Sequence, residues 1–72
     1  MINFVPGNLV RFAPNKNGLW PGGYDISGAL AKVFGPDDVG MYIGPWKETI
    51  DYSRVIVGDQ LMLVDNARII SF

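Results

Sequence analysis

Apolar side chains occupy most positions of residues 54–64, on both sides of a central Gly58-Asp59 dipeptide. Such a dipeptide between two apolar runs predicts a β-hairpin with a two-residue turn. The turn fixes which residues face one another, and the expected pairs are Val57 with Gln60, Ile56 with Leu61, Val55 with Met62 and Arg54 with Leu63. This hairpin is the most specific structural prediction that the sequence offers.

Both faces of the predicted hairpin are apolar. Opposed residues share a face, and successive residues alternate between faces. One face carries Val55, Val57, Met62 and Val64, and the other carries Ile56, Leu61 and Leu63. One face can pack on the core of the protein, so the other needs a second cover. In a chain of 72 residues that cover is most simply a second copy or another protein, and Ile56, Leu61 and Leu63 are the predicted oligomer interface.

Shorter β patterns occur on both sides of this hairpin. Residues 9–12 and 39–43 alternate with a period of two, which is typical of strands. Residues 46–51 are predicted to be a loop, residues 65–67 a single 3₁₀ turn, and residues 68–72 a final short strand. The pattern therefore predicts an all-β protein.

Residues 13–38 are rich in glycine and proline and form a long excursion between the first two predicted strands. Its part from 25 to 34 has two interpretations. Helical spacing of the apolar residues, a cap at Asp25 and a stop at Gly35 favour a helix. Gly28 costs about 1 kcal/mol inside a helix relative to alanine, and the residues after it alternate as in a strand. We expect an extended returning arm.

Size and composition narrow the classes of function. The chain forms one domain, residues 1–72, near the lower size limit for a single stabilising core. It has no cysteine and no histidine, which removes disulfides, the usual zinc ligands and the commonest catalytic base. No enzyme activity, metal, cofactor or small-molecule substrate is predicted. The formal net charge of -1, without a basic run, argues against binding of nucleic acid.

Asp37 and Asp38 are the only adjacent acidic pair. A hard cation needs six or more oxygen ligands, and the local spacing supplies just two carboxylates. Aspartate side chains commonly accept hydrogen bonds from nearby backbone amides in turns. We therefore expect the pair to stabilise the turn that follows Pro36.

Taken together, these elements resemble an SH3-like barrel. The resemblance rests on the first strand, the Gly35-Pro36-Asp37-Asp38 turn, the Gly58-Asp59 hairpin tip and the residues 65–68 before Ile69. It implies a five-stranded barrel with a long first loop and a single 3₁₀ turn before the last strand. It also implies a barrel core that contains Val10, Val55, Val64 and Ile69.

Residues 6–12 and 38–44 are also similar to short uncharacterised bacteriophage proteins of this architecture. No apolar segment approaches the roughly 20 residues that cross a bilayer. Residues 1–7 lack the basic flank and apolar stretch of a signal peptide. We therefore expect a cytoplasmic protein without membrane contact, in the host cytoplasm or the virion if a phage encodes it.

The peptide-binding members of the SH3-like family stack an extended, proline-rich ligand on aromatic side chains. In this chain Trp20 and Tyr24 lie in the long loop, Trp46 lies in a later loop, and Tyr52 begins the third strand. The resemblance implies that these four residues form a peptide groove. The same aromatic side chains can instead hold their own loops in place, and the sequence leaves both interpretations open.

Two hypotheses about function follow. The first is a non-enzymatic interaction or structural module that associates with itself or with a protein partner through Ile56, Leu61 and Leu63. The alternative is a peptide-binding module of the SH3 type, which would use the four loop aromatics.

Overall fold

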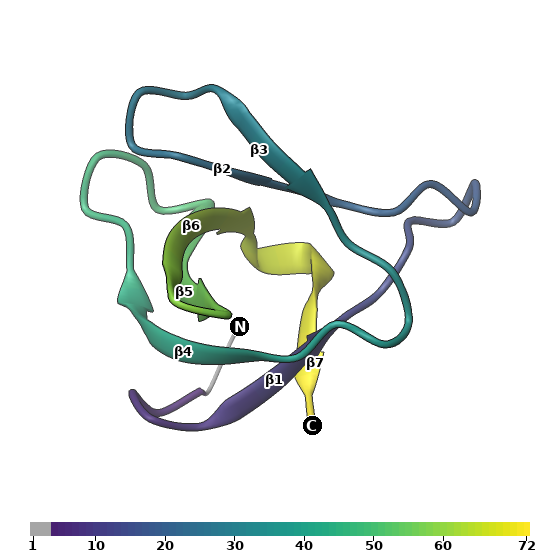
Figure 1. The fold of residues 1–72 in the computed structure, drawn as a ribbon, viewed down its shortest axis with the longest axis horizontal. Helices are drawn as coiled ribbons and strands as arrows, with labels where there is room; N and C mark the ends of the chain where they lie inside the picture. Colours follow the sequence, from purple (N-terminus) through teal and green to yellow (C-terminus); the bar gives the residue numbers. More distant parts are fainter. Residues whose placement is uncertain (1–3) are drawn as a thin grey trace.

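The computed structural model describes residues 4–72, which form seven strands and one 3₁₀ turn (Figure 1). The elements are β1 (Leu9–Phe12), β2 (Gly22–Tyr24), β3 (Leu30–Val33), β4 (Gly40–Pro45), β5 (Tyr52–Val57), β6 (Gln60–Asp65), η1 (Asn66–Arg68) and β7 (Ile69–Ser71). All paired strands are antiparallel and belong to one sheet, in the order β3-β2-β6-β5-β4-β1-β7. The predicted all-β class and the single turn before the last strand are confirmed.

The predicted five-stranded barrel is not confirmed. The sheet has seven strands and is open, with β3 and β7 at its two ends. The additional strands, β2 and β3, lie in the long excursion of residues 13–38. The sequence predicted that part of this excursion is extended, but not that β2 and β3 pair with each other. Figure 1 shows the sheet curled, with β2 and β3 above, β1 and β4 below, and η1 between β6 and β7.

The β5–β6 hairpin has the predicted register. Each of the four expected pairs, from Val57 with Gln60 to Arg54 with Leu63, is present. Gly58 is the first turn residue and has a φ of 66°. Asp59, the second, has a negative φ, as do all other non-glycine residues in the described range. A left-handed glycine at the first turn position is typical of a type II′ turn, whose twist matches that of the flanking strands.

Residues 22–33 form an arm, which we define as β2, β3 and the turn between them. The extended interpretation is confirmed, and the helical alternative is wrong. Asp25 caps the turn of the arm rather than a helix, because its carboxylate accepts hydrogen bonds from the N–H groups of Ser27 and Ala29. The arm joins the sheet where Tyr24 pairs with Leu63 of β6.

Two contacts fix the base of the arm on the core. The Phe34 ring stacks on Phe12 with ring centroids 4.0 Å apart and planes 6° apart. Gly23 lies where a Cβ would be 2.6 Å from Met62 Sδ and 2.7 Å from Cζ of Phe34. Such distances are shorter than ordinary van der Waals contacts, so a side chain at this position would force Met62 or the Phe34 ring to shift, and glycine lets β2 lie this close to the core.

The hydrophobic core draws on five strands and on the residue that follows β3. Its buried members are Val10, Phe12, Phe34, Tyr42, Val55, Met62, Val64 and Ile69. The four core residues that the resemblance implied, Val10, Val55, Val64 and Ile69, are all among them. On β4 the inward position is taken by Tyr42, while its neighbour Met41 is 41% exposed.

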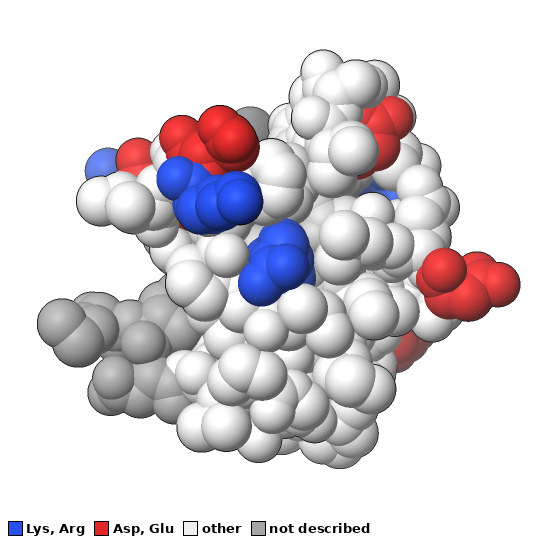
Figure 2. All heavy atoms as spheres, turned by 90° about the vertical axis from the view of Figure 1, so that its left-hand side faces the viewer, with Lys and Arg blue, Asp and Glu red and all other residues white. Residues whose placement is uncertain are grey.

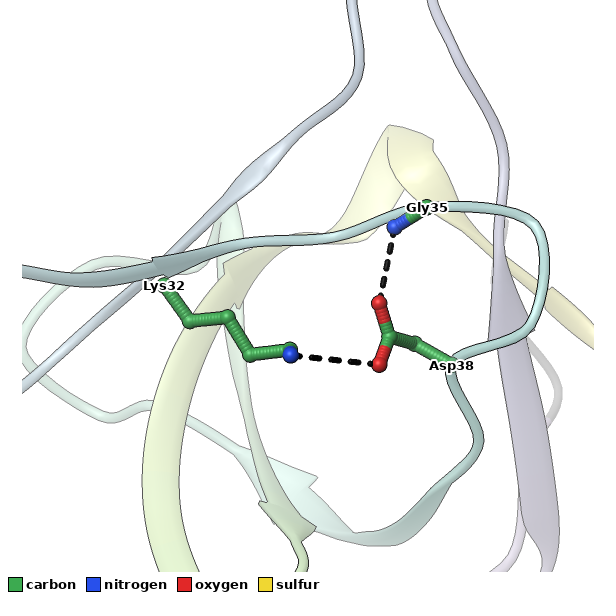
Figure 3. Close-up of polar contacts among 3 residues, drawn as sticks. All are labelled: Lys32, Gly35 and Asp38. Carbon is green, nitrogen blue, oxygen red and sulfur yellow. Dashed lines mark hydrogen bonds and ion pairs between the residues drawn. The ribbon is translucent and has the colours of Figure 1, made fainter.

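Asp38 closes the turn between β3 and β4 (Figure 3). One carboxylate oxygen accepts from the Gly35 N–H at 2.8 Å, and the other lies 3.3 Å from Lys32 Nζ. The expectation that the acidic pair stabilises this turn is confirmed for Asp38, whereas Asp37 is exposed. Within residues 4–72, no three acidic side chains come together in a way that could hold a metal ion.

No helix in the described part of the chain has the length and apolar character needed to cross a bilayer. The signal-peptide prediction concerned residues 1–7, and residues 1–3 lie outside the described range.

Candidate functional site

A hollow of about 250 Å³ lies between the arm and the β4–β5 loop. Its lining consists of Tyr24, Gly28, Trp46, Thr49, Tyr52 and Leu63. Three of the four aromatic residues predicted to form a groove thus meet here. None of the lining residues carries a charge, so this hollow suits an apolar ligand segment.

A second hollow, of about 310 Å³, shares both tyrosines with the first. Trp20, Tyr24 and Tyr52 line it together with Asp65 and Arg68. Because Tyr24 and Tyr52 border both hollows, the two spaces adjoin. We call them together the aromatic groove, and it contains all four predicted aromatic residues.

Neighbouring strands position the two tyrosines at the centre of the aromatic groove. Tyr24 ends β2 opposite Leu63, and Tyr52 begins β5 opposite Asp65 on the same strand, β6. The tyrosine rings meet edge to face, with centroids 6.4 Å apart and an angle of 68°. Both tyrosines are half-buried, as are both tryptophans. Each aromatic side chain therefore packs on the protein and still presents surface to the groove.

Asn66 holds the β4–β5 loop beside η1. Its side-chain amide donates to the Ile50 carbonyl at 2.8 Å, and its backbone N–H donates to the Asp51 carbonyl at 2.8 Å. Its side-chain oxygen accepts from the hydroxyl of Ser53, a residue that is 1% exposed. The Ser53 hydroxyl also lies 3.4 Å from the Tyr42 hydroxyl. This network fixes the loop that bears Trp46 relative to the rest of the groove.

The charges of the groove lie at its η1 end. The Asp65 carboxylate accepts from the Ala67 N–H at 2.9 Å, and Arg68 Nη1 donates to the Pro14 carbonyl at 3.0 Å. Both side chains are therefore held by the protein itself. They give the second hollow hydrogen-bonding character, in contrast to the uncharged first hollow.

The turn at the tip of the arm depends on the Asp25 carboxylate. A hydrogen bond from the Ser27 side chain, supported by the Ala29 and Ser27 backbone N–H groups, lowers the pKa of Asp25 below its ordinary value of 3.8. These bonds favour the charged form of the carboxyl. They favour the turn at the arm tip, which includes Gly28 of the first hollow, at neutral pH.

One of the three residues of the predicted oligomer interface, Leu63, is covered by the chain itself. Leu63 is 7% exposed, because the arm pairs with β6 at this position and the first hollow lies over it. Leu61 is 40% exposed and Ile56 is half-buried. The chain itself thus provides the cover at one end of the apolar outward face, and only the other end stays open.

The open end of that face continues across neighbouring strands. Leu9 pairs with Met41, Met41 pairs with Ile56, and Ile56 pairs with Leu61. Directly opposed residues share a face, so these four side chains form a row across β1, β4, β5 and β6. We call Leu9, Met41, Ile56 and Leu61 the apolar row.

Sequence reasoning missed Thr49 in the first hollow and Asn66 beneath the β4–β5 loop. Thr49 belongs to no periodic pattern or motif, and Asn66 was predicted only as part of the 3₁₀ turn. The Asn66 contact with Ile50 spans 16 residues, and asparagine near a turn is normally explained by local hydrogen bonds. Comparison of the chain with protein-family models, with curated proteins and with solved structures finds no match.

Proposed function

We propose that this chain is a non-enzymatic interaction module, related in architecture to SH3-like domains, that binds an extended, proline-rich peptide in the aromatic groove. The observation that carries the proposal is the convergence of Trp20, Tyr24, Trp46 and Tyr52 from separate segments onto two adjoining hollows. The relation to SH3-like domains and the suggested phage origin are part of this proposal.

The shape and chemistry of the groove favour an extended ligand. Extended proline-rich segments have no internal hydrogen bonds and dock into grooves lined by aromatic rings, at low entropic cost because they are already ordered. Half-buried tyrosine and tryptophan rings offer flat apolar surface for such docking. The strand pairing of β1 with β7 and β4, and the single 3₁₀ turn beside the groove, are the features that support the SH3-like relation.

Self-association is the second candidate function, and the apolar row supports it. Leu9 is 50%, Met41 41% and Leu61 40% exposed. Contiguous exposed apolar side chains on a small protein commonly mark an interface. Leu63, the third residue of the predicted interface, lines the aromatic groove and is not part of the row, which leaves less apolar surface for association.

Tryptophan fluorescence tests the peptide groove directly, because one tryptophan lines each hollow. Addition of a proline-rich peptide should shift and change the emission in a saturable way. Tyr52→Ala, which removes the ring shared by both hollows, should weaken binding about tenfold, in line with the loss of one aromatic contact. Phe72→Ala is the matched control, since Phe72 is 63% exposed and lines neither hollow.

An unchanged spectrum of the folded wild type at millimolar peptide would contradict the proposed function. Equal loss of binding in Tyr52→Ala and Phe72→Ala would also count against it, because a groove-specific contact cannot depend on a residue outside the groove.

A further inference from the structure

A third hollow, of about 280 Å³, adjoins the aromatic groove at Trp46, which lines this hollow and the first. Its other lining residues are Pro45, Lys47 and Arg54. It therefore contains two cationic side chains and no acidic one. We call it the basic hollow.

Arg54 is half-buried, and its guanidinium is in no ion pair within the described residues. Its Nε is buried and is the one buried side-chain nitrogen or oxygen in the described residues without a hydrogen-bond partner. Its Nη2 lies over Gly44, where a Cβ would be 3.0 Å away. The ion pair in residues 4–72 joins Lys32 to Asp38 and leaves the Arg54 charge unpaired. The buried Nε is out of reach of a ligand, but the same guanidinium lines the basic hollow without an acidic neighbour, so an acceptor supplied from outside can pair with its Nη atoms.

The lining of the basic hollow contains no acidic side chain that could neutralise Lys47 and Arg54. Figure 2 looks onto the side of the molecule where the β4–β5 loop and the tip of the arm lie in Figure 1. Figure 2 shows basic atoms near the middle of that face with uncharged surface below them, a second basic group above them beside acidic atoms, and further acidic atoms at the right edge. A charge with apolar neighbours is less screened than one in open water, so it attracts an anionic group more strongly.

We propose that the basic hollow binds a carboxylate of the same peptide that occupies the aromatic groove. The inference rests on the proposed function and names the ligand more closely, as a proline-rich segment flanked by an acidic group. The Arg54 guanidinium would donate from its Nη atoms to the two carboxylate oxygens, the geometry that arginine favours. Lys47, at the rim of the same hollow, would add a second positive charge.

Fluorescence anisotropy with four labelled peptides tests this inference on the full chain. All share one proline-rich segment, flanked by two glutamates or two glutamines, and each version is made with a free and with an amidated C-terminus. The glutamate peptides should bind wild type about tenfold more tightly than the glutamine peptides. If the free C-terminus alone confers the tighter binding, the carboxylate that binds is the terminal one, which also supports the inference.

Arg54→Gln should remove the preference for the carboxylate and keep the binding of the amidated glutamine peptide. Arg11→Gln is the matched control, because Arg11 is exposed on β1 and lines none of the three hollows. A salt series on wild type gives a second readout that does not depend on a folded variant. Raising the salt from about 50 mM to about 500 mM should weaken the acidic peptides selectively.

Equal affinity of all four peptides for wild type would overturn the inference and leave the proposed function intact. Absence of binding by every peptide would overturn both. A carboxylate preference that persists unchanged in folded Arg54→Gln would also overturn the assignment to the basic hollow.

Discussion

Asn66 shows how single side chains determine the shape of the aromatic groove. Through three hydrogen bonds it joins η1 to the end of the β4–β5 loop and to the buried hydroxyl of Ser53. If the side chain is removed, the buried Ser53 hydroxyl keeps only the Tyr42 hydroxyl as a partner, whereas the Ile50 carbonyl lies at the exposed surface. A polar group that loses its partner while it stays buried costs about 1–3 kcal/mol.

We expect Asn66→Ala to lower the free energy of unfolding by about 1–3 kcal/mol and to weaken peptide binding, because the loop that bears Trp46 is no longer fixed. Chemical denaturation followed by tryptophan fluorescence measures the first effect. Asn17→Ala is the control, since Asn17 is an exposed asparagine in the loop before β2. Equal stability of the Asn66 and Asn17 variants would show that the network contributes nothing.

Asp25 gives a prediction about pH at the same scale. Its pKa is lowered by the Ser27 side chain and the Ala29 backbone, so the carboxyl should titrate below 3.8 in the folded protein. A lowered folded pKa means that the contribution to stability is present at higher pH. The stability that the charged Asp25 carboxylate contributes is lost as the pH falls below 3.8, its ordinary pKa, and through its lower pKa in the folded protein. In an NMR titration, the Ser27 and Ala29 amide signals should shift in that acidic range. In Asp25→Asn these signals should stay constant over the same range.

At the scale of elements, the hairpin and the arm differ in how far the sequence determines them. The β5–β6 register could be predicted because a two-residue turn and an apolar pattern fix it locally. The arm could be predicted as extended but not as two paired strands. β2 has only three residues, and two of them are glycines, so it has no strand signal of its own. Its place depends on the fit of Gly23 against Met62 and Phe34, which no local pattern reports.

Gly23→Ala should therefore displace the arm. The added methyl group would collide with Met62 Sδ and the Phe34 ring, and overpacking of this kind costs about 1–3 kcal/mol. Hydrogen exchange of the β2 and β3 amides should increase more than that of the β5–β6 hairpin. Gly35→Ala is the matched control, since a Cβ there has nothing closer than an Asp38 oxygen at 4.0 Å. Protection of β2 equal to wild type in Gly23→Ala would contradict the steric role of Gly23.

At the scale of the whole molecule, the outward face of the sheet is divided into two parts. The arm and the β4–β5 loop border one part and form the aromatic groove, while the apolar row stays open at the other. The sequence correctly placed Ile56, Leu61 and Leu63 on one face but could not divide it, because the division depends on where the arm lies. The four aromatic residues were identified through the SH3-like resemblance. Their convergence depends on long-range contacts that the sequence does not display.

This division makes self-association and peptide binding separable. We expect Met41→Lys combined with Leu61→Lys to abolish any concentration-dependent increase in mass, because two charges in the apolar row cannot be buried against a second copy without partners. Both residues are about 40% exposed, so the folded monomer should tolerate the lysines. Leu63→Lys is the contrasting variant. It should destabilise the fold, since Leu63 is 7% exposed.

Sedimentation velocity over a range of concentrations measures the mass, and the fluorescence assay measures peptide binding by the same samples. The Met41 and Leu61 double variant should bind peptide as wild type does, because neither residue lines the aromatic groove. Wild type that stays monomeric at high micromolar concentration would remove self-association as a function. Loss of peptide binding in a folded double variant would show that the two parts of the face act together, against the division proposed here.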